Sequence, residues 1–118
     1  MAARKSKKKP YTVVVEGLPT PKGRPRMTRR GRVFTPQRTL DAEARIAAAW
    51  TGPVYEGPVQ MDCIFGSVGV VVTVIPLGEE KSSLRGDLDN YVKLLMDGLN
   101  GVAWTDDKQV MKIVAVKL

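Results

Sequence analysis

The segment Gly86–Gly101, "GDLDNYVKLLMDGLNG", decides the fold class because its apolar residues recur at the spacing of a helix. Four of them stand at i, i+4, i+7 and i+11 and predict one buried stripe: Leu88, Val92, Leu95 and Leu99. The spacing predicts a helix from about Asp87 to Val102. A stripe of this kind must pack on another layer of structure.

The layer is expected to be a β-sheet, since the segments around this helix are rich in β-branched residues. Two strands are predicted at Val59–Phe65 and Val68–Ile75, joined by a short link that contains Gly66 and Ser67. A third strand is predicted within Tyr11–Leu18, and "GRVFT" predicts a short one near residue 33. The C-terminal "VMKIVAVKL" alternates and predicts a final strand, with Lys112 and Lys117 facing outward.

A second helix is predicted from about Pro36 to Trp50, with Thr35 as its N-cap and Pro36 in its first helical position. The fold class is therefore α+β, a single domain in which two helices cover a mixed or antiparallel sheet. At 118 residues the chain is long enough for one modest core. Residues 1–9 are predicted to be a disordered basic arm, and residues 10–118 to form the domain.

Composition excludes several classes of site and of location. The chain has no histidine, which removes zinc sites built on histidine and general-base catalysis by histidine. Its single cysteine, Cys63, allows no disulfide within one chain. No apolar run approaches the roughly 20 residues of a membrane helix, and no secretory apolar region follows the basic start. A cytoplasmic protein with no membrane partner is therefore expected.

The net charge of +7 is distributed unevenly along the chain. Twelve of the nineteen Lys and Arg residues lie at or before Arg38, where the only acid is Glu16. Basic regions of this density usually bind phosphate, so nucleic acid is the expected partner and a small-molecule substrate is not. The candidate DNA-binding residues are Lys22, Arg24, Arg26, Arg29, Arg30, Arg32 and Arg85. The alternative is a merely solvated basic loop and tail.

Acidic residues cluster in the opposite half, where they would repel the same nucleic acid unless cations neutralise them. Asp87 and Asp89 stand at the entrance of the predicted helix, and Lys93 follows Asp89 by one turn. Asp106 and Asp107 lie in a predicted turn that can return toward that helix. Each feature also has a structural explanation: Asp87 as an N-cap, Lys93 as an i,i+4 ion-pair partner, and the two later aspartates as turn residues.

Taken together, these carboxylates suit a magnesium site. Mg²⁺ binds through a few carboxylates and keeps several waters, and it can polarise a phosphodiester and steady its leaving oxygen. Lys93 is then a candidate for stabilising the charge that develops on the phosphate.

At these residues the sequence resembles the RusA family of Holliday junction resolvases. The matching segments are "PKGRPR" at 21–26, "FTP" at 34–36, "GDLDNYVKLLMDGLNG" at 86–101 and "WTDDKQV" at 104–110. The resemblance implies a homodimeric, Mg²⁺-dependent endonuclease, with Mn²⁺ as an alternative metal, that cuts four-way DNA junctions by paired symmetric nicks in recombination and repair.

The resemblance also implies roles for single residues. It places the catalytic and metal-binding acids on Asp87, Asp89 and Asp107, the essential lysine on Lys93, and a supporting acid on Asp106; Asp97 matches an acid with a structural role. Two alternatives stay open: a nuclease for other branched DNA such as flaps and forks, and a non-catalytic basic DNA-binding protein.

Overall fold

The computed structural model describes residues 9–23, 25–78 and 81–118 of the chain. It divides into two compact units, Met1–Glu79 and Glu80–Leu118. The first contains strands β1 to β5 and helix α1, and the second contains helix α2 and a 3₁₀ turn, η1. Two helices and a small antiparallel sheet confirm the predicted α+β class.

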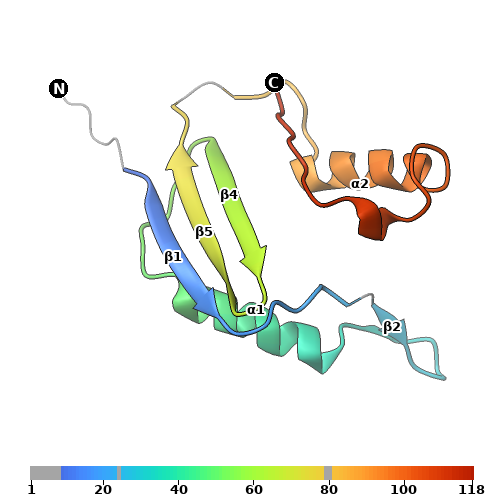
Figure 1. Cartoon of the computed structure of the whole chain (residues 1–118). Helices are drawn as coiled ribbons and strands as arrows, with labels where there is room; N and C mark the ends of the chain where they lie inside the picture. The colour runs from blue at the N-terminus through green and yellow to red at the C-terminus, as the bar shows by residue number, and fades with distance from the viewer. Residues whose placement is uncertain (1–8, 24, 79–80) are drawn as a thin grey trace. The chain divides into compact units, whose positions relative to one another are not determined.

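The first unit is built on a three-stranded antiparallel sheet with the order β1-β5-β4 (Figure 1). Strand β1 spans Tyr11–Glu16, β4 spans Val59–Gly66 and β5 spans Gly69–Pro76, close to the predicted bounds. The valine-rich β5 is the central strand. It pairs along its whole length with β4, and with β1 from Gly69 to Val74. Gly69 is required at its start, because a Cβ there would lie 2.8 Å from the carbonyl oxygen of Val15.

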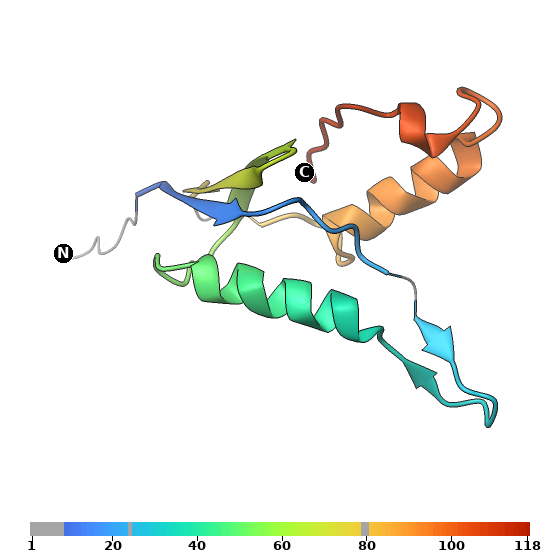
Figure 2. The ribbon, with the colours of Figure 1, turned by 60° about the horizontal axis from the view of Figure 1, so that its bottom comes forward.

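Helix α1, Gln37–Ala49, lies against one face of this sheet, beneath β1 (Figure 2). Thr39 and Ala42 are its buried residues. The predicted cap is wrong by one residue: Pro36 is the N-cap, with an extended ψ of 143°, so its own carbonyl accepts from Thr39 N and Leu40 N. Thr35 therefore precedes the helix by two residues and does not cap it.

Two short strands, β2 at Arg26–Met27 and β3 at Val33–Phe34, pair with each other and form a separate antiparallel ribbon. Strand β3 confirms the short strand expected in "GRVFT". Strand β2 was not predicted from the sequence, and both of its residues, Arg26 and Met27, are exposed.

Helix α2 of the second unit spans Leu88–Leu99, with Asp87 as its N-cap. The predicted buried stripe is only partly correct. Leu88 and Val92 are half-buried, but Leu95 is 65% exposed and Leu99 is 37% exposed. Met96, at i+4 from Val92, is half-buried instead.

The predicted C-terminal strand is wrong. The structure describes residues 110–118 in full and shows no helix or strand among them. A strand needs a hydrogen-bonded neighbour, and the elements of the second unit are one helix and one 3₁₀ turn. Lys117 was expected to face out with Lys112, but Lys117 is half-buried and Lys112 is exposed.

The predicted basic arm at residues 1–9 lies outside the described residues except for Lys9. The Lys9 carbonyl accepts a hydrogen bond from the Tyr55 hydroxyl. Within the described chain, the helices are too short or too polar to cross a membrane.

Candidate active site and nucleic-acid interface

The start of α2 presents two carboxylates to solvent. Asp87 occupies the N-cap position through its backbone, since its carbonyl accepts from Asn90 N at 3.1 Å and Tyr91 N at 3.3 Å. Its side chain makes no capping hydrogen bond within the described unit, which leaves both carboxylate oxygens available. Asp89 lies in the first turn and is also exposed. The partial positive charge of the helix N-terminus favours this placement of negative charge.

The residue before this pair is held from two sides. Gly86 N donates to the hydroxyl of Tyr91 at 3.2 Å, and Gly86 O accepts from Lys117 Nζ at 2.9 Å. A Cβ at position 86 would lie 3.0–3.1 Å from three atoms of the Tyr91 side chain, so glycine suits this close approach. The contacts fix the path of the chain into Asp87, and neither Tyr91 nor Lys117 was predicted to have this role.

Removing the ammonium of Lys117 should loosen this junction. We expect Lys117→Met, which keeps the length of the side chain, to lower the free energy of unfolding by about 1 kcal/mol, the usual net contribution of such a hydrogen bond. Lys112→Met is the matched control, because Lys112 is exposed on the same segment. Urea unfolding of the two variants and of the wild type measures the difference. Equal midpoints for both variants would mean that the bond to Gly86 adds nothing to stability.

The two aspartates in the turn after α2 make different hydrogen bonds. Asp106 is the N-cap of η1, Asp107–Gln109, and its side chain accepts from Lys108 N at 2.9 Å in a capping box with Gln109. Asp107 is half-buried, and its Oδ1 accepts from Trp104 Nε1 at 2.7 Å. Asp106 is thus engaged in shaping the turn, whereas the Asp107 carboxylate is oriented by an indole and keeps a second oxygen.

Lys93 lies on α2 one turn after Asp89, and its side chain is exposed. In the chain as described, the ion pair within 4.0 Å is Lys22–Glu43, so Lys93 pairs with neither Asp89 nor Asp97. The structural explanation of Lys93 as an i,i+4 ion-pair partner is therefore not what the structure shows. Its ammonium is available for a ligand.

The structure brings Asp87 and Asp89 together at one helix end. Over residues 9–23, 25–78 and 81–118 it shows no group of three Asp, Glu, Cys or His side chains arranged to hold a metal ion. The convergence of Asp107 on the other two carboxylates therefore stays a prediction. Two carboxylates from one helix entrance are nevertheless a donor set of the kind that Mg²⁺ uses, together with waters and substrate phosphates.

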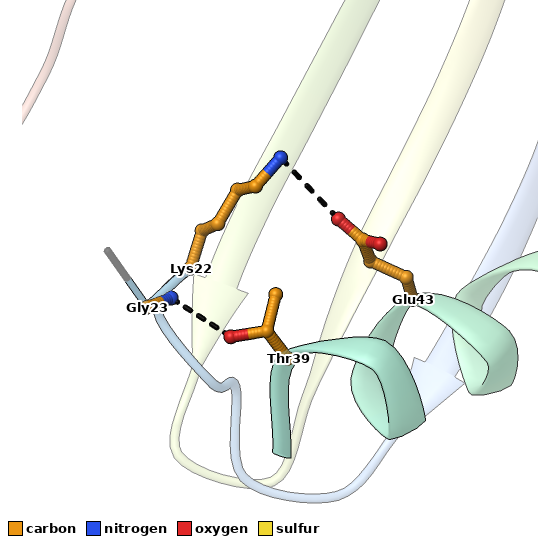
Figure 3. Close-up of polar contacts among 4 residues, drawn as sticks. All are labelled: Lys22, Gly23, Thr39 and Glu43. Carbon is orange, nitrogen blue, oxygen red and sulfur yellow. Dashed lines mark hydrogen bonds and ion pairs between the residues drawn. The ribbon is translucent and has the colours of Figure 1, made fainter. Parts of the chain in front are cut away.

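The first of the predicted DNA-binding residues, Lys22, lies in the loop after β1. Contacts with helix α1 hold this loop in place (Figure 3). Gly23 N donates to Oγ1 of the buried Thr39 at 2.9 Å, and Lys22 Nζ lies 3.4 Å from Glu43 Oε2. Both ends of that ion pair are exposed, so it contributes little to stability and does not prevent Lys22 from binding an anion. Arg24 lies outside the described residues.

The turn between β2 and β3 carries the next arginines. Three hydrogen bonds close it: Thr28 N to Arg32 O at 2.8 Å, Gly31 N to Thr28 O at 3.0 Å, and Arg32 N to Thr28 Oγ1 at 3.0 Å. Gly31 has a φ of +83°, a value that glycine adopts without strain. Besides Lys22, the exposed residues among the predicted DNA-binding set are Arg26, Arg29, Arg30 and Arg32 of this ribbon, and Arg85 before α2.

Among the described residues, the exposed carboxylates at the α2 entrance could bind a divalent cation, and the arginine-rich ribbon is of the kind that binds phosphate. The model of the family described as Endodeoxyribonuclease RusA matches residues 16–118. The chain therefore belongs to the RusA family of endodeoxyribonucleases, which confirms the resemblance seen in its sequence. Neither the curated proteins nor the solved structures gave a match to the chain.

Proposed function

We propose that the chain is a Mg²⁺-dependent endonuclease that resolves four-way DNA junctions by paired nicks, as a homodimer, in recombination and repair. Membership of the RusA family supports the nuclease activity and DNA as the partner. The observation that carries the site is the entrance of α2, where Asp87 and Asp89 are exposed and the side chain of Asp87 does not cap the helix. A purely structural aspartate at this position would be expected to cap it.

Asp87 and Asp89 are the residues that would hold Mg²⁺, with Mn²⁺ as the alternative ion. The bound ion would supply a positive charge that polarises the phosphodiester and steadies the leaving oxygen. Asp107 is proposed as the third carboxylate, because the hydrogen bond from Trp104 orients it. Asp106 supports it by capping η1.

Lys93 is proposed to act on the scissile phosphate through its ammonium group. It is exposed and unpaired within the described part of the chain, so it can approach a negatively charged oxygen without first breaking an ion pair. A positive charge fixed near the phosphate stabilises the additional charge of the transition state. The arginines of the ribbon and the adjacent loop are proposed to bind phosphates, which position the substrate without reading its sequence.

A homodimer fits this substrate by symmetry. A four-way junction has approximate two-fold symmetry, and a C2 dimer presents one identical site to each of two opposed strands. Two nicks at symmetric positions then follow from two equivalent sites.

Nicking assays test the proposal against its alternatives. The purified chain is incubated with a labelled mobile four-way junction, a flap and a linear duplex, each with Mg²⁺ and with EDTA. Paired nicks in the junction alone, dependent on Mg²⁺, are the expected result. Cleavage of the flap as efficiently as the junction would favour a broader branched-DNA nuclease. Tight binding with no cleavage of any substrate would favour a non-catalytic DNA-binding protein.

A further inference from the structure

The ribbon formed by residues 26–34 exposes apolar side chains beside its arginines. Met27 pairs with Val33 and Arg26 with Phe34 in the antiparallel register. Opposed residues of such a pair share one face, and successive residues alternate between faces. Met27 and Val33 therefore form an apolar pair on one face of the ribbon. They are 66% and 63% exposed.

The other described residues of the first unit leave this pair largely exposed. Strands β2 and β3 form their own two-stranded sheet, and Figures 1 and 2 both show it projecting beyond the N-terminal end of α1, away from the three-stranded sheet. An isolated two-stranded ribbon is marginally stable in water. Its apolar pair gains stability only if a partner buries it.

The charge of the ribbon indicates the chemistry of that partner. The same ribbon and its turn carry Arg26, Arg29, Arg30 and Arg32, and the sequence has no acid between Glu16 and Asp41. An open hollow at the turn is lined by Thr28 and three of these arginines, a suitable place for a phosphate. The partner must therefore be polyanionic and must also offer apolar surface.

DNA at a branch point offers both kinds of surface. Phosphates line its arms, while bases at the point of strand exchange lose stacking partners and expose their faces. Proteins that distort DNA place Met and similar apolar side chains against unstacked base steps. A two-stranded ribbon also has the width that a DNA groove admits. A linear duplex offers phosphates to the arginines of the ribbon but no unstacked bases to its apolar pair.

We propose that the Arg26–Phe34 ribbon inserts at the branch point, with its arginines on phosphates and Met27 and Val33 against unstacked bases. This inference rests on the proposed function in taking branched DNA as the substrate. It adds a basis for selecting junction over duplex, and it assigns that selection to residues separate from the carboxylates and Lys93.

The test compares Met27→Ser/Val33→Ser with a matched control, Val68→Ser/Met111→Ser. The control replaces the same two residue types at positions that are 82% and 90% exposed outside the ribbon. Affinities for a four-way junction and for a linear duplex of equal length are measured in EDTA, so that no cleavage occurs. The junction carries 2-aminopurine at the branch point, whose fluorescence rises when the base unstacks. Circular dichroism checks that each variant is folded.

Loss of the apolar pair should lower junction affinity about tenfold, because less apolar surface is buried against the bases, and leave duplex affinity unchanged. The wild type and the control should raise the 2-aminopurine signal, and the ribbon variant should not. Unchanged junction affinity, or an equal loss for junction and duplex, would overturn the proposal. So would vesicles of anionic phospholipid that bind the wild type but not the ribbon variant while junction affinity stays constant.

Failure of the proposed function gives a different result. A wild-type chain that unstacks the branch-point base in EDTA but nicks no DNA with Mg²⁺ would refute the nuclease and keep the ribbon. Normal nicking of junctions by the ribbon variant, with normal affinity, would refute the role of the ribbon and keep the nuclease.

Discussion

Asp89→Asn is expected to abolish junction cleavage and to leave junction binding unchanged or slightly tighter. Asparagine has nearly the same shape as aspartate but lacks the negative charge that a divalent cation requires. Losing a metal ligand removes several kcal/mol of transition-state stabilisation, so the rate should fall by roughly 10³-fold or more. Removing one negative charge beside the phosphates also lessens repulsion of the DNA.

Asp97→Asn is the matched control, because Asp97 is an exposed aspartate on the same helix, two turns further on. Cleavage is measured in single turnover with saturating enzyme and 10-fold steps in Mg²⁺, and binding is measured separately in EDTA. The control should cut and bind as the wild type does. Weak binding by Asp89→Asn with normal cutting would contradict the assignment of this carboxylate to the metal.

Patterns confined to one element predicted structure well. The strands around Gly66 and Ser67 were predicted within about a residue, because glycine marks the turn between them and the second strand is a continuous β-branched run. The final strand failed for a reason outside its own sequence. Residues 110–118 alternate correctly, but a strand also needs a hydrogen-bonded neighbour, which local alternation does not specify.

In the candidate site, too, contacts between residues far apart in the sequence could not be predicted from local patterns. Asp87, Asp89 and Lys93 were identified because they lie within two turns of one helix. The residues that hold this entrance, Tyr91 and Lys117, were missed. Their contacts run through the Gly86 backbone, and Lys117 lies 31 positions away from it, which no spacing rule covers. Thr39 accepts a hydrogen bond from Gly23 of the basic loop. It was missed because nothing in the sequence distinguishes it from other residues of helix α1.

The signal for Trp104 was present in "WTDDKQ" but was interpreted only as a turn. An indole N–H three residues before an aspartate can donate to it within a tight turn, and Trp104 does so to Asp107. This contact, with the capping role of Asp106, is the reason that Asp107 and not Asp106 is proposed as the third carboxylate.

The second large effect is expected at Lys93. Two explanations of this residue predict different outcomes for Lys93→Ala. An exposed ion pair with a neighbouring aspartate would change stability by well under 1 kcal/mol and leave cleavage nearly normal. Stabilisation of charge on the scissile phosphate would lower the cleavage rate by roughly 10²-fold or more. The first explanation lacks its ion pair, since among the described residues Lys93 pairs with no aspartate of its own helix.

The measurement is single-turnover cleavage of a mobile four-way junction at saturating enzyme and Mg²⁺, so that binding and product release do not limit the rate. Lys112→Ala is the control, an exposed lysine outside α2. Lys93→Ala should fold normally and bind the junction as the wild type does, because a single exposed lysine adds little to either. Lys93→Arg should restore little activity, since a planar guanidinium cannot replace a compact ammonium at one oxygen. Recovery by arginine would mean that only positive charge matters there, and cleavage by Lys93→Ala within a few-fold of wild type would remove the residue from the catalytic machinery.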